Sequence, residues 1–303
     1  MMDIGLIGLG RMGAGLARRL SRGGVRVVAF DRSPDAVRGL SGEPHVEGAA
    51  SMTDLCVKLT SPRIVLMMIP AGDAVETTID ELRPLLVRGD VVIDGGNSYD
   101  RDSMRRGELC DASGIEYIDA GISGGIHGLE HGFCIMAGGS ADAMARVEPI
   151  VRVLAPGPDR GWIHCGPRGA GHYAKMVHNA IEYGMMQALA EGFALIDARR
   201  DLEIDAGELA EAWRHGSVVR SWLLDLCAGI LNERGDLSGV APVVADSGEG
   251  RWAALESVEL GVPTPVMASA LASRFASQGG ADHANRILAM MRARFGGHPT
   301  ATA

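Results

Sequence analysis

The chain has 303 residues, with 29 Lys or Arg against 38 Asp or Glu, which gives a formal net charge of −9. This acidic balance and an aromatic content of only 4 % argue against a general nucleic-acid-binding protein, which needs a basic surface and stacking side chains. The length predicts two domains, and a hydrophobic content of 47 % suffices for a sizeable core. The 42 glycines are about twice the usual frequency, which indicates many places where backbone turns or approaches another group closely.

Cysteine usage and the absence of long apolar runs bear on localisation. The five cysteines are scattered without a Cys-x-x-Cys pair, as is typical of a reducing compartment. No basic segment followed by a long apolar stretch opens the chain, so no signal peptide is expected. The longest apolar run, Ile64–Ala71, is far shorter than the ~20 residues of a membrane span. We therefore expect a soluble, cytoplasmic protein.

Short apolar runs alternate with amphipathic stretches over residues 1–165. The expected strands are Ile4–Ile7, Val25–Phe30, Ile64–Ile69, Val91–Asp94, Ile115–Asp119 and Cys134–Ala137. Helical stretches between them include Met12–Leu20, Ala74–Leu86 and Ser103–Ser113. Strands that alternate with helices predict an α/β domain with a mostly parallel, doubly wound sheet.

The sequence pattern changes near residue 165, and no strand is expected after it. The expected helices are Ala174–Arg199, Asp205–Arg214, Ser221–Asn232, Trp252–Leu260, Pro265–Ser277 and His283–Phe295. We therefore predict a second, all-helical domain over residues 166–303 that binds substrate and forms oligomer contacts, with a flexible tail from Gly296 to Ala303.

A glycine-rich turn follows the first expected strand and opens the first expected helix. Its residues are Gly8, Leu9, Gly10, Arg11, Met12 and Gly13. In this strand–turn–helix context the Gly-x-Gly-x-x-Gly spacing predicts a Rossmann-type dinucleotide site, with phosphates at the helix N-terminus. The alternative is a glycine turn in a doubly wound fold that binds another nucleotide.

The two residues that directly follow the next expected strand, Asp31 and Arg32, bear on the choice between NAD and NADP. Asp31 lies 18 residues after Gly13, where an acidic side chain accepts hydrogen bonds from ribose hydroxyls and repels a 2′-phosphate. This favours NAD. Arg32 could instead pair with a 2′-phosphate, so NADP stays an alternative.

The most informative stretch for chemistry runs from Gly169 to Tyr183. At ~100° per residue, five polar side chains fall within an arc of about 140° of one helix, with mostly apolar residues opposite. They are Lys175, His178, Asn179, Glu182 and Tyr183. A lysine can take a proton from an alcohol if burial lowers its pKa, and a carboxyl group can return a proton elsewhere on the substrate. The alternative is a solvated helix face with Lys–Glu pairing.

Two glycine-rich loops could face this helix. One is Asp94–Ser98, which leaves a strand and contains Asn97, and the other is Ala120–Gly125, which contains Ser123, Gly124 and Gly125. Each would offer backbone N–H groups and a polar side chain to a carboxylate or hydroxyl, although either could be an ordinary turn.

With these motifs the chain resembles the short form of the 6-phosphogluconate dehydrogenase family, within the β-hydroxyacid dehydrogenase superfamily. The resemblance runs through nearly the whole chain, and the run Lys-Met-Val-His-Asn-x-Ile-Glu-Tyr at 175–183 is its most specific marker. Further markers are Met67–Pro70, Gly250–Ala253 and Phe295–His298. Relatives that only oxidise or reduce usually carry Asn-Asn where this chain has His178-Asn179.

The resemblance implies oxidative decarboxylation of 6-phosphogluconate to ribulose 5-phosphate with NAD. Lys175 would be the base that takes the C3 hydroxyl proton, and Glu182 would protonate C1 of the enediol. Substrate binding is implied for Asn97, Ser123, Gly124, Gly125, His178, Asn179 and Tyr183, and cofactor contacts for the residues of the glycine turn, Asp31, Arg32, Pro70 and Asn97. No metal is implied, and no cluster of carboxylates suited to Mg²⁺ or Mn²⁺ is evident.

The resemblance also implies how an acidic protein binds a phosphate. Arg274 matches the phosphate-binding arginine of the family, while Arg292 and His298 match a pair that reaches in from a neighbouring subunit of a homodimer or homotetramer. One departure is the loop Asp246–Arg251, which is shorter than in long forms and lacks a phosphate-contacting lysine. Two alternatives therefore stay open: a non-decarboxylating dehydrogenase of a small unphosphorylated hydroxyacid, and a dinucleotide-binding scaffold without activity. Neither a nucleic-acid nor a membrane partner is expected.

Overall fold

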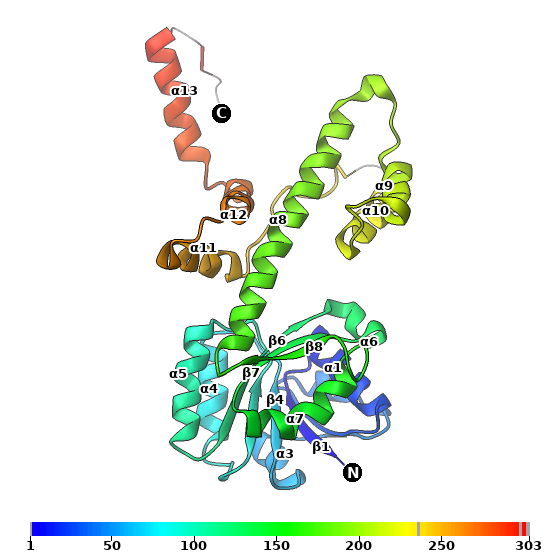
Figure 1. The fold of residues 1–303 in the computed structure, drawn as a ribbon, viewed down its shortest axis with the longest axis vertical. Coiled ribbons are helices and arrows are strands. Elements are labelled where there is room, and N and C mark those ends of the chain that lie inside the picture. The colour runs from blue at the N-terminus through cyan, green and yellow to red at the C-terminus, as the bar shows by residue number, and fades with distance from the viewer. Residues whose placement is uncertain (1, 235–236, 297–298, 301–303) are drawn as a thin grey trace. The chain divides into compact units, whose positions relative to one another are not determined.

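The computed structural model describes residues 2–234, 237–296 and 299–300 (Figure 1). By its contacts the chain forms two compact units, Met1–Val177 and His178–Ala303. This division lies after the expected domain boundary near residue 165, because the first turns of the long helix α8 (Ala170–Ala198) pack on the sheet of the first unit. The boundary near 165 remains a prediction about the functional domains.

The first unit is built on one eight-stranded sheet. Its strands are β1 (Asp3–Ile7), β2 (Arg26–Phe30), β3 (Val46–Gly48), β4 (Ile64–Met67), β5 (Val91–Asp94), β6 (Glu116–Ser123), β7 (Cys134–Gly138) and β8 (Trp162–Gly166). Their order is β3-β2-β1-β4-β5-β6-β7-β8, and all neighbours are parallel except β6 and β7. The expected α/β fold with a mostly parallel sheet is confirmed.

Two strands, β3 and β8, were not expected from the sequence. Both lie at edges of the sheet, where one side of the strand is open to solvent. Their residues are mostly half-buried or exposed, so they lack the continuous apolar run that marks the buried central strands.

Helices cover both faces of this sheet (Figure 1). On one face α1 (Arg11–Arg22) and α7 (Ala141–Leu154) contribute Leu16, Leu20 and Val147 to a core with β1 and β2. On the other face α3 (Met52–Lys58), α4 (Asp73–Leu82) and α5 (Asp100–Asp111) bury residues such as Leu55 and Ile79. The short segments are α2 (Pro34–Arg38), η1 (Gly125–His127) and α6 (Gly128–His131).

The second unit is helical throughout its described residues. After α8 and the short η2 (Arg200–Leu202) come α9 (Ala206–Gly216), α10 (Trp222–Arg234), α11 (Glu249–Leu260), α12 (Pro265–Ser277) and α13 (Asp282–Gly296). This confirms the expected helical C-terminal region. Of the expected tail, Gly296 ends α13, Pro299 and Thr300 have no regular structure, and 297–298 and 301–303 lie outside the described residues.

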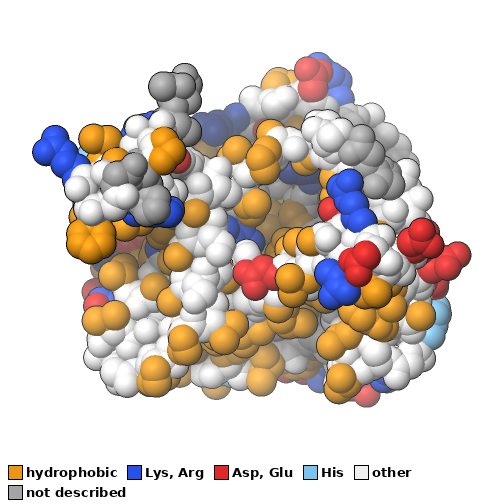
Figure 2. Space-filling view, turned by 90° about the horizontal axis from the view of Figure 1, so that it is seen from above, with side chains coloured by type: hydrophobic (Ala, Val, Ile, Leu, Met, Phe, Trp, Pro, Cys, Tyr) orange, Lys and Arg blue, Asp and Glu red, His pale blue; other side chains and the backbone are white. Residues whose placement is uncertain are grey.

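Hydrophobic burial in the second unit is sparse. Its cores consist of small clusters, one of them around Phe193 and Leu224 and another around Tyr183 and Leu271. Helix α13 has no buried residue, and Phe295 is 98 % exposed. Hydrophobic side chains stand among charged ones on the face drawn in Figure 2. Among the described helices, none combines the length and apolarity needed to cross a bilayer.

Candidate active site

The glycine-rich turn lies between β1 and α1. Gly8 has φ +92°, and a Cβ there would lie 2.4 Å from the Met68 carbonyl oxygen; a Cβ on Gly13 would lie 1.9 Å from the Gly8 carbonyl oxygen. These two positions need glycine for the turn itself to form. A Cβ on Gly10 would meet nothing within 4 Å, so the space beside the N-terminus of α1 is open. That is where a pyrophosphate would accept hydrogen bonds from helical N–H groups.

Asp31 ties the next strand to this turn. Its carboxylate accepts hydrogen bonds from the backbone N–H of Leu9 (2.7 Å) and of Ser33 (2.8 Å). Arg32 beside it is exposed, as are Arg11 and Pro70. The expected cofactor residues therefore gather at the carboxyl edge of the sheet, because the ends of β1, β2, β4 and β5 lie in register.

Gly10→Ala and Gly13→Ala should separate cofactor binding from folding. We expect Gly10→Ala to weaken NAD binding about 10- to 100-fold, since the methyl group crowds only a bound ligand, with the melting temperature unchanged. Gly13→Ala should also lower the free energy of unfolding by ~1–3 kcal/mol, because it collides with Gly8 inside the protein. Calorimetric NAD titration and thermal unfolding give the two readouts. A Gly10→Ala chain that binds NAD normally would contradict this location of the pyrophosphate.

A buried carboxylate organises the loop that carries Asn97. Asp94, fully buried at the end of β5, accepts hydrogen bonds from the Ser98 hydroxyl (2.8 Å), the Gly96 N–H (3.1 Å) and the Tyr117 hydroxyl (3.0 Å). Burial, with the charge of Asp94, raises the pKa of Tyr117 well above its usual value. Asn97 is left exposed at the tip of a fixed loop.

A second buried carboxylate, Asp119, fixes the start of α8. It accepts hydrogen bonds from the backbone N–H groups of Gly169 (2.7 Å) and His172 (2.8 Å). Burial raises the pKa of Asp119, while His172 and these hydrogen bonds oppose that rise. The N-terminal turn of α8 is thereby held against β6.

Lys175 lies on the turn of α8 that follows, and its stem crosses β6. A Cβ on Gly121 would be 2.2 Å from the Lys175 Cβ and 2.8 Å from its Cγ, so this strand position has no room for a side chain. Lys175 is 6 % exposed. Ser123 ends the same strand, and Gly124 (φ +133°) and Gly125 (φ +53°) follow it. The first unit therefore brings Lys175 to the strand that carries the expected Ser123 loop.

The second unit carries the remaining polar face of α8. The His178 Nδ1 lies 3.0 Å from the Asn179 Oδ1 and 3.9 Å from the Glu182 Oε2. Asn179 and Tyr183 are buried, whereas Ile181 is 46 % exposed. Burial does not separate the two sides of the helix, because Met176 and Ala180 on the apolar side are also buried, whereas the His178 and Glu182 side chains are 37 % and 40 % exposed.

The loop 246–251 and α12 enclose Tyr183. The Tyr183 hydroxyl oxygen accepts a hydrogen bond from the Ser247 N–H (3.1 Å), and the Arg274 guanidinium carbon lies 3.5 Å from the centre of the Tyr183 ring. Arg274 also donates to the Ala245 carbonyl oxygen (2.5 Å). Arg292 is exposed on α13, and His298 lies outside the described residues.

Sequence reasoning missed one buried acid in this cluster. Glu249 is 1 % exposed and accepts a hydrogen bond from the Asn179 Nδ2 (2.8 Å). The sequence does contain a signal for it, an acidic residue between two glycines, Gly248 and Gly250, in the loop that stood out for its shortness and its missing lysine.

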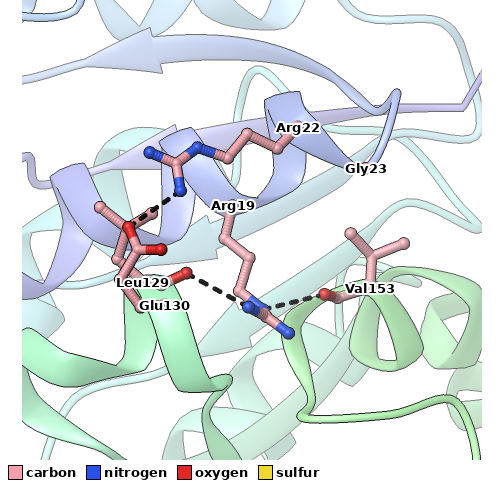
Figure 3. A pocket seen from close by; sticks show the side chains of 6 residues that line it. All are labelled: Arg19, Arg22, Gly23, Leu129, Glu130 and Val153. Atoms are coloured by element: carbon pink, nitrogen blue, oxygen red, sulfur yellow. Dashed lines mark hydrogen bonds and ion pairs between the residues drawn. The ribbon is translucent and has the colours of Figure 1, made fainter.

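The groove in Figure 3 lies at the other end of α1 from the glycine-rich turn. Its volume is about 270 Å³, and Arg19 and Arg22 line it. Arg19 donates to carbonyl oxygens of Leu129, Val153, Leu154 and Ala155, and Arg22 pairs with Glu130. The guanidinium of Arg19 thus binds α7 to α1, and the groove is a structural contact. Over the described part of the chain, no His, Cys, Asp or Glu side chains group in a way that could hold a metal ion.

Two family profiles together cover most of the chain. The NAD binding domain of 6-phosphogluconate dehydrogenase matches residues 3–165, and the C-terminal domain of 6-phosphogluconate dehydrogenase matches residues 171–295. The chain belongs to the 6-phosphogluconate dehydrogenase family. This confirms the resemblance seen in the motifs.

Individual relatives of this family agree with the assignment. The NAD(+)-dependent, decarboxylating 6-phosphogluconate dehydrogenase of Haloferax volcanii is 43 % identical over 302 residues, covering 99 % of each chain. An enzyme of the same description from Bacillus subtilis is 35 % identical over 91 % of this chain and 61 % of its own.

Solved structures show the same fold. The 6-phosphogluconate dehydrogenase of Plasmodium falciparum matches with a TM-score of 0.84 and 30 % identity, over 99 % of this chain and 66 % of that one. A 3-hydroxyisobutyrate dehydrogenase of Mycobacterium tuberculosis matches with a TM-score of 0.69 at 22 % identity, which shows a shared fold alone.

Proposed function

We propose that this chain oxidises and decarboxylates 6-phospho-D-gluconate to D-ribulose 5-phosphate and CO₂, with reduction of NAD. The observation that carries the proposal is the face of α8, where Lys175 is buried against β6 and Asn179, Glu182 and Tyr183 follow along the same helix. The names of two relatives, one matched over 99 % and the other over 61 % of its own length, support this substrate and this cofactor.

Lys175 is the proposed base. NAD supplies the hydride acceptor, and the open space at Gly10 with the ribose-binding position of Asp31 suits it. Lys175 takes the proton of the C3 hydroxyl while the hydride leaves C3, which produces a 3-keto acid. The C1–C2 bond of the substrate, which joins the carboxylate to the chain, then breaks, and its electron pair moves toward the ketone oxygen. Lys175, now an ammonium, returns its proton to that oxygen.

Glu182 is the proposed acid for the last step. Glu182 gives the enediol left after CO₂ release a proton on the former C2 of the acid, which becomes C1 of ribulose 5-phosphate. Lys175 takes back the proton of the former C3 hydroxyl, so that the ketone forms there. The Glu182 side chain is 40 % exposed, so it can exchange protons with water between turnovers.

The remaining polar residues are the proposed substrate contacts. The proposed contacts to the acid end are Asn97, Ser123, Gly124, Gly125, His178, Asn179 and Tyr183. Arg274 would bind the 6-phosphate, since its guanidinium is anchored on one side by the Ala245 carbonyl and the Tyr183 ring.

We further infer that the active enzyme is a homodimer or homotetramer in which Arg292 and His298 bind phosphate in a neighbouring subunit. Helix α13 has no buried residue and exposes large hydrophobic side chains, which supports contact with a second copy. Mixing Lys175→Met chains with Arg292→Ala chains tests this. Recovered activity supports the shared site, and no recovery in verified hybrids contradicts it.

A second candidate is oxidation of a small unphosphorylated hydroxyacid. It is favoured by one observation: Arg251, a cation of the loop 246–251, is paired with Asp246 at 2.8 Å and is thus partly neutralised. A substrate panel read by cofactor reduction decides between them. We expect 6-phosphogluconate to be used far better than gluconate or three- and four-carbon hydroxyacids, and NAD better than NADP. Preference for a small hydroxyacid would support the second candidate instead.

A further inference from the structure

The residue that the structure leaves chemically incomplete is Glu249. Its carboxylate is 1 % exposed, yet only one oxygen has a partner: Oε1 accepts a hydrogen bond from the Asn179 Nδ2, while Oε2 has none among the described residues. A buried carboxylate oxygen without a donor is costly, and such atoms in folded proteins usually have a partner. A missing donor is therefore expected at Oε2.

Several contacts hold the loop around Glu249, so the position of its carboxylate is fixed by the surrounding structure. Asp246 and Arg251 form a two-point ion pair across the loop (2.8 and 3.0 Å). The Ser247 N–H donates to the Tyr183 hydroxyl oxygen. A Cβ on Gly250 would lie 2.8 Å from the Tyr183 ring, so the chain passes directly against that ring. These contacts hold Glu249 next to residues of the proposed substrate site in the same unit.

Glu249 also sets the orientation of its neighbours. Because the Asn179 Nδ2 donates to Glu249, the Asn179 Oδ1 faces the His178 Nδ1 and accepts from it at 3.0 Å. His178 then carries its proton on Nδ1 and presents Nε2 as an acceptor. A single carboxylate thus orders the side chains of both His178 and Asn179.

The charge and hydrogen-bonding capacity of the Glu249 Oε2 determine which ligand groups it can bind. A carboxylate only accepts hydrogen bonds, and it repels the carboxylate and phosphate of a sugar acid. The hydroxyl groups along the sugar chain are neutral donors that match it. We propose that the Glu249 Oε2 accepts a hydrogen bond from a non-reacting hydroxyl of the substrate, at C2, C4 or C5, and so selects polyhydroxy acids over simple ones. This proposal rests on the proposed function.

The test pairs Glu249→Gln with substrates that lack one hydroxyl. Gln keeps the size and the acceptor for Asn179 but turns an N–H donor toward the ligand. For 6-phosphogluconate we expect the KM to rise about tenfold or more, because a hydrogen bond to a charged acceptor is lost. The KM for NAD should stay within twofold. The 2-, 4- and 5-deoxy analogues are then compared in both chains.

One analogue should reveal the contact by non-additivity. With the analogue that lacks the contacted hydroxyl, the unsubstituted chain and Glu249→Gln should have the same kcat/KM, whereas the other two analogues should show the full loss. Glu259→Gln, the same change at the exposed end of α11, is the control and should behave as the unsubstituted chain. Glu249→Asp keeps the negative charge but moves the carboxylate away from the ligand, because the side chain is one methylene shorter. It should weaken binding of substrates that carry the contacted hydroxyl and leave binding of the analogue that lacks it unchanged.

The possible failures are distinguishable. An equal loss with every analogue, or an unchanged KM in Glu249→Gln, would overturn the role of Glu249 while leaving the proposed function intact. If the unsubstituted chain neither binds nor oxidises 6-phosphogluconate, the proposed function fails, and this inference fails with it.

Discussion

Lys175→Met is expected to lower kcat for 6-phosphogluconate oxidation about 10³- to 10⁴-fold, the contribution typical of a positioned acid or base. The methionine side chain fills similar space along β6 and Gly121 but cannot take or return a proton. The NAD dissociation constant should stay within twofold, since the proposed cofactor contacts lie in the turn before α1 and after β2. Steady-state kinetics and NAD titration measure the two effects.

The chain offers a matched control for this variant. Lys58 is the only other lysine, and it pairs with Glu47 and Asp54 on the surface of α3. Lys58→Met should retain activity within twofold. If Lys175→Met lost NAD binding, or kept more than a tenth of the activity, the assignment of Lys175 as the base would be wrong.

Gly121→Ala is expected to have the second-largest effect on activity. The new methyl group would lie 2.2 Å from the Lys175 Cβ, an atom fixed by the helix backbone, so the lysine must move. A displacement of about 1 Å at a reacting group can reduce kcat about 100-fold. The free energy of unfolding should also fall by ~1–3 kcal/mol through overpacking.

Gly5→Ala separates these two consequences. Its methyl group would lie 2.7 Å from the Leu55 Cδ2, which crowds the same sheet at β1, away from Lys175. Both variants should lose stability, but when kinetics are measured well below both melting temperatures only Gly121→Ala should lose kcat. Equal losses of kcat in the two variants would show that general destabilisation, and not displacement of Lys175, causes the effect.

Sequence patterns predicted the parts of the fold that have strong local signals. The glycine-rich turn, the central strands and the six long helices of the second half have clear periodicity or fixed spacing, and the structure has them. Strands β3 and β8 were not predicted because edge strands bury few side chains and so lack a continuous apolar run. The helix ends differ from the predicted ones by a few residues because terminal residues have weak conformational preferences.

The buried acids were the harder part of the site to foresee. Asp94 and Asp119 end or interrupt apolar strand runs, where a carboxylate looks like a simple strand terminus. Their function depends on donors brought from elsewhere in the chain: Tyr117 to Asp94, and Gly169 to Asp119. Glu249 likewise has as its hydrogen-bond partner Asn179, which lies 70 positions earlier in the chain. Such partnerships are a property of tertiary structure, which local pattern cannot show.

In the proposed reaction, one active site couples oxidation at C3 to loss of the carboxylate. The direct measurement is the ratio of CO₂ released to NADH formed from 6-phosphogluconate labelled with ¹³C at C1. We expect one labelled CO₂ per NADH, with ribulose 5-phosphate as the sugar product. NADH formed without CO₂, and with the label kept in a keto acid, would contradict it and make the chain a simple hydroxyacid dehydrogenase.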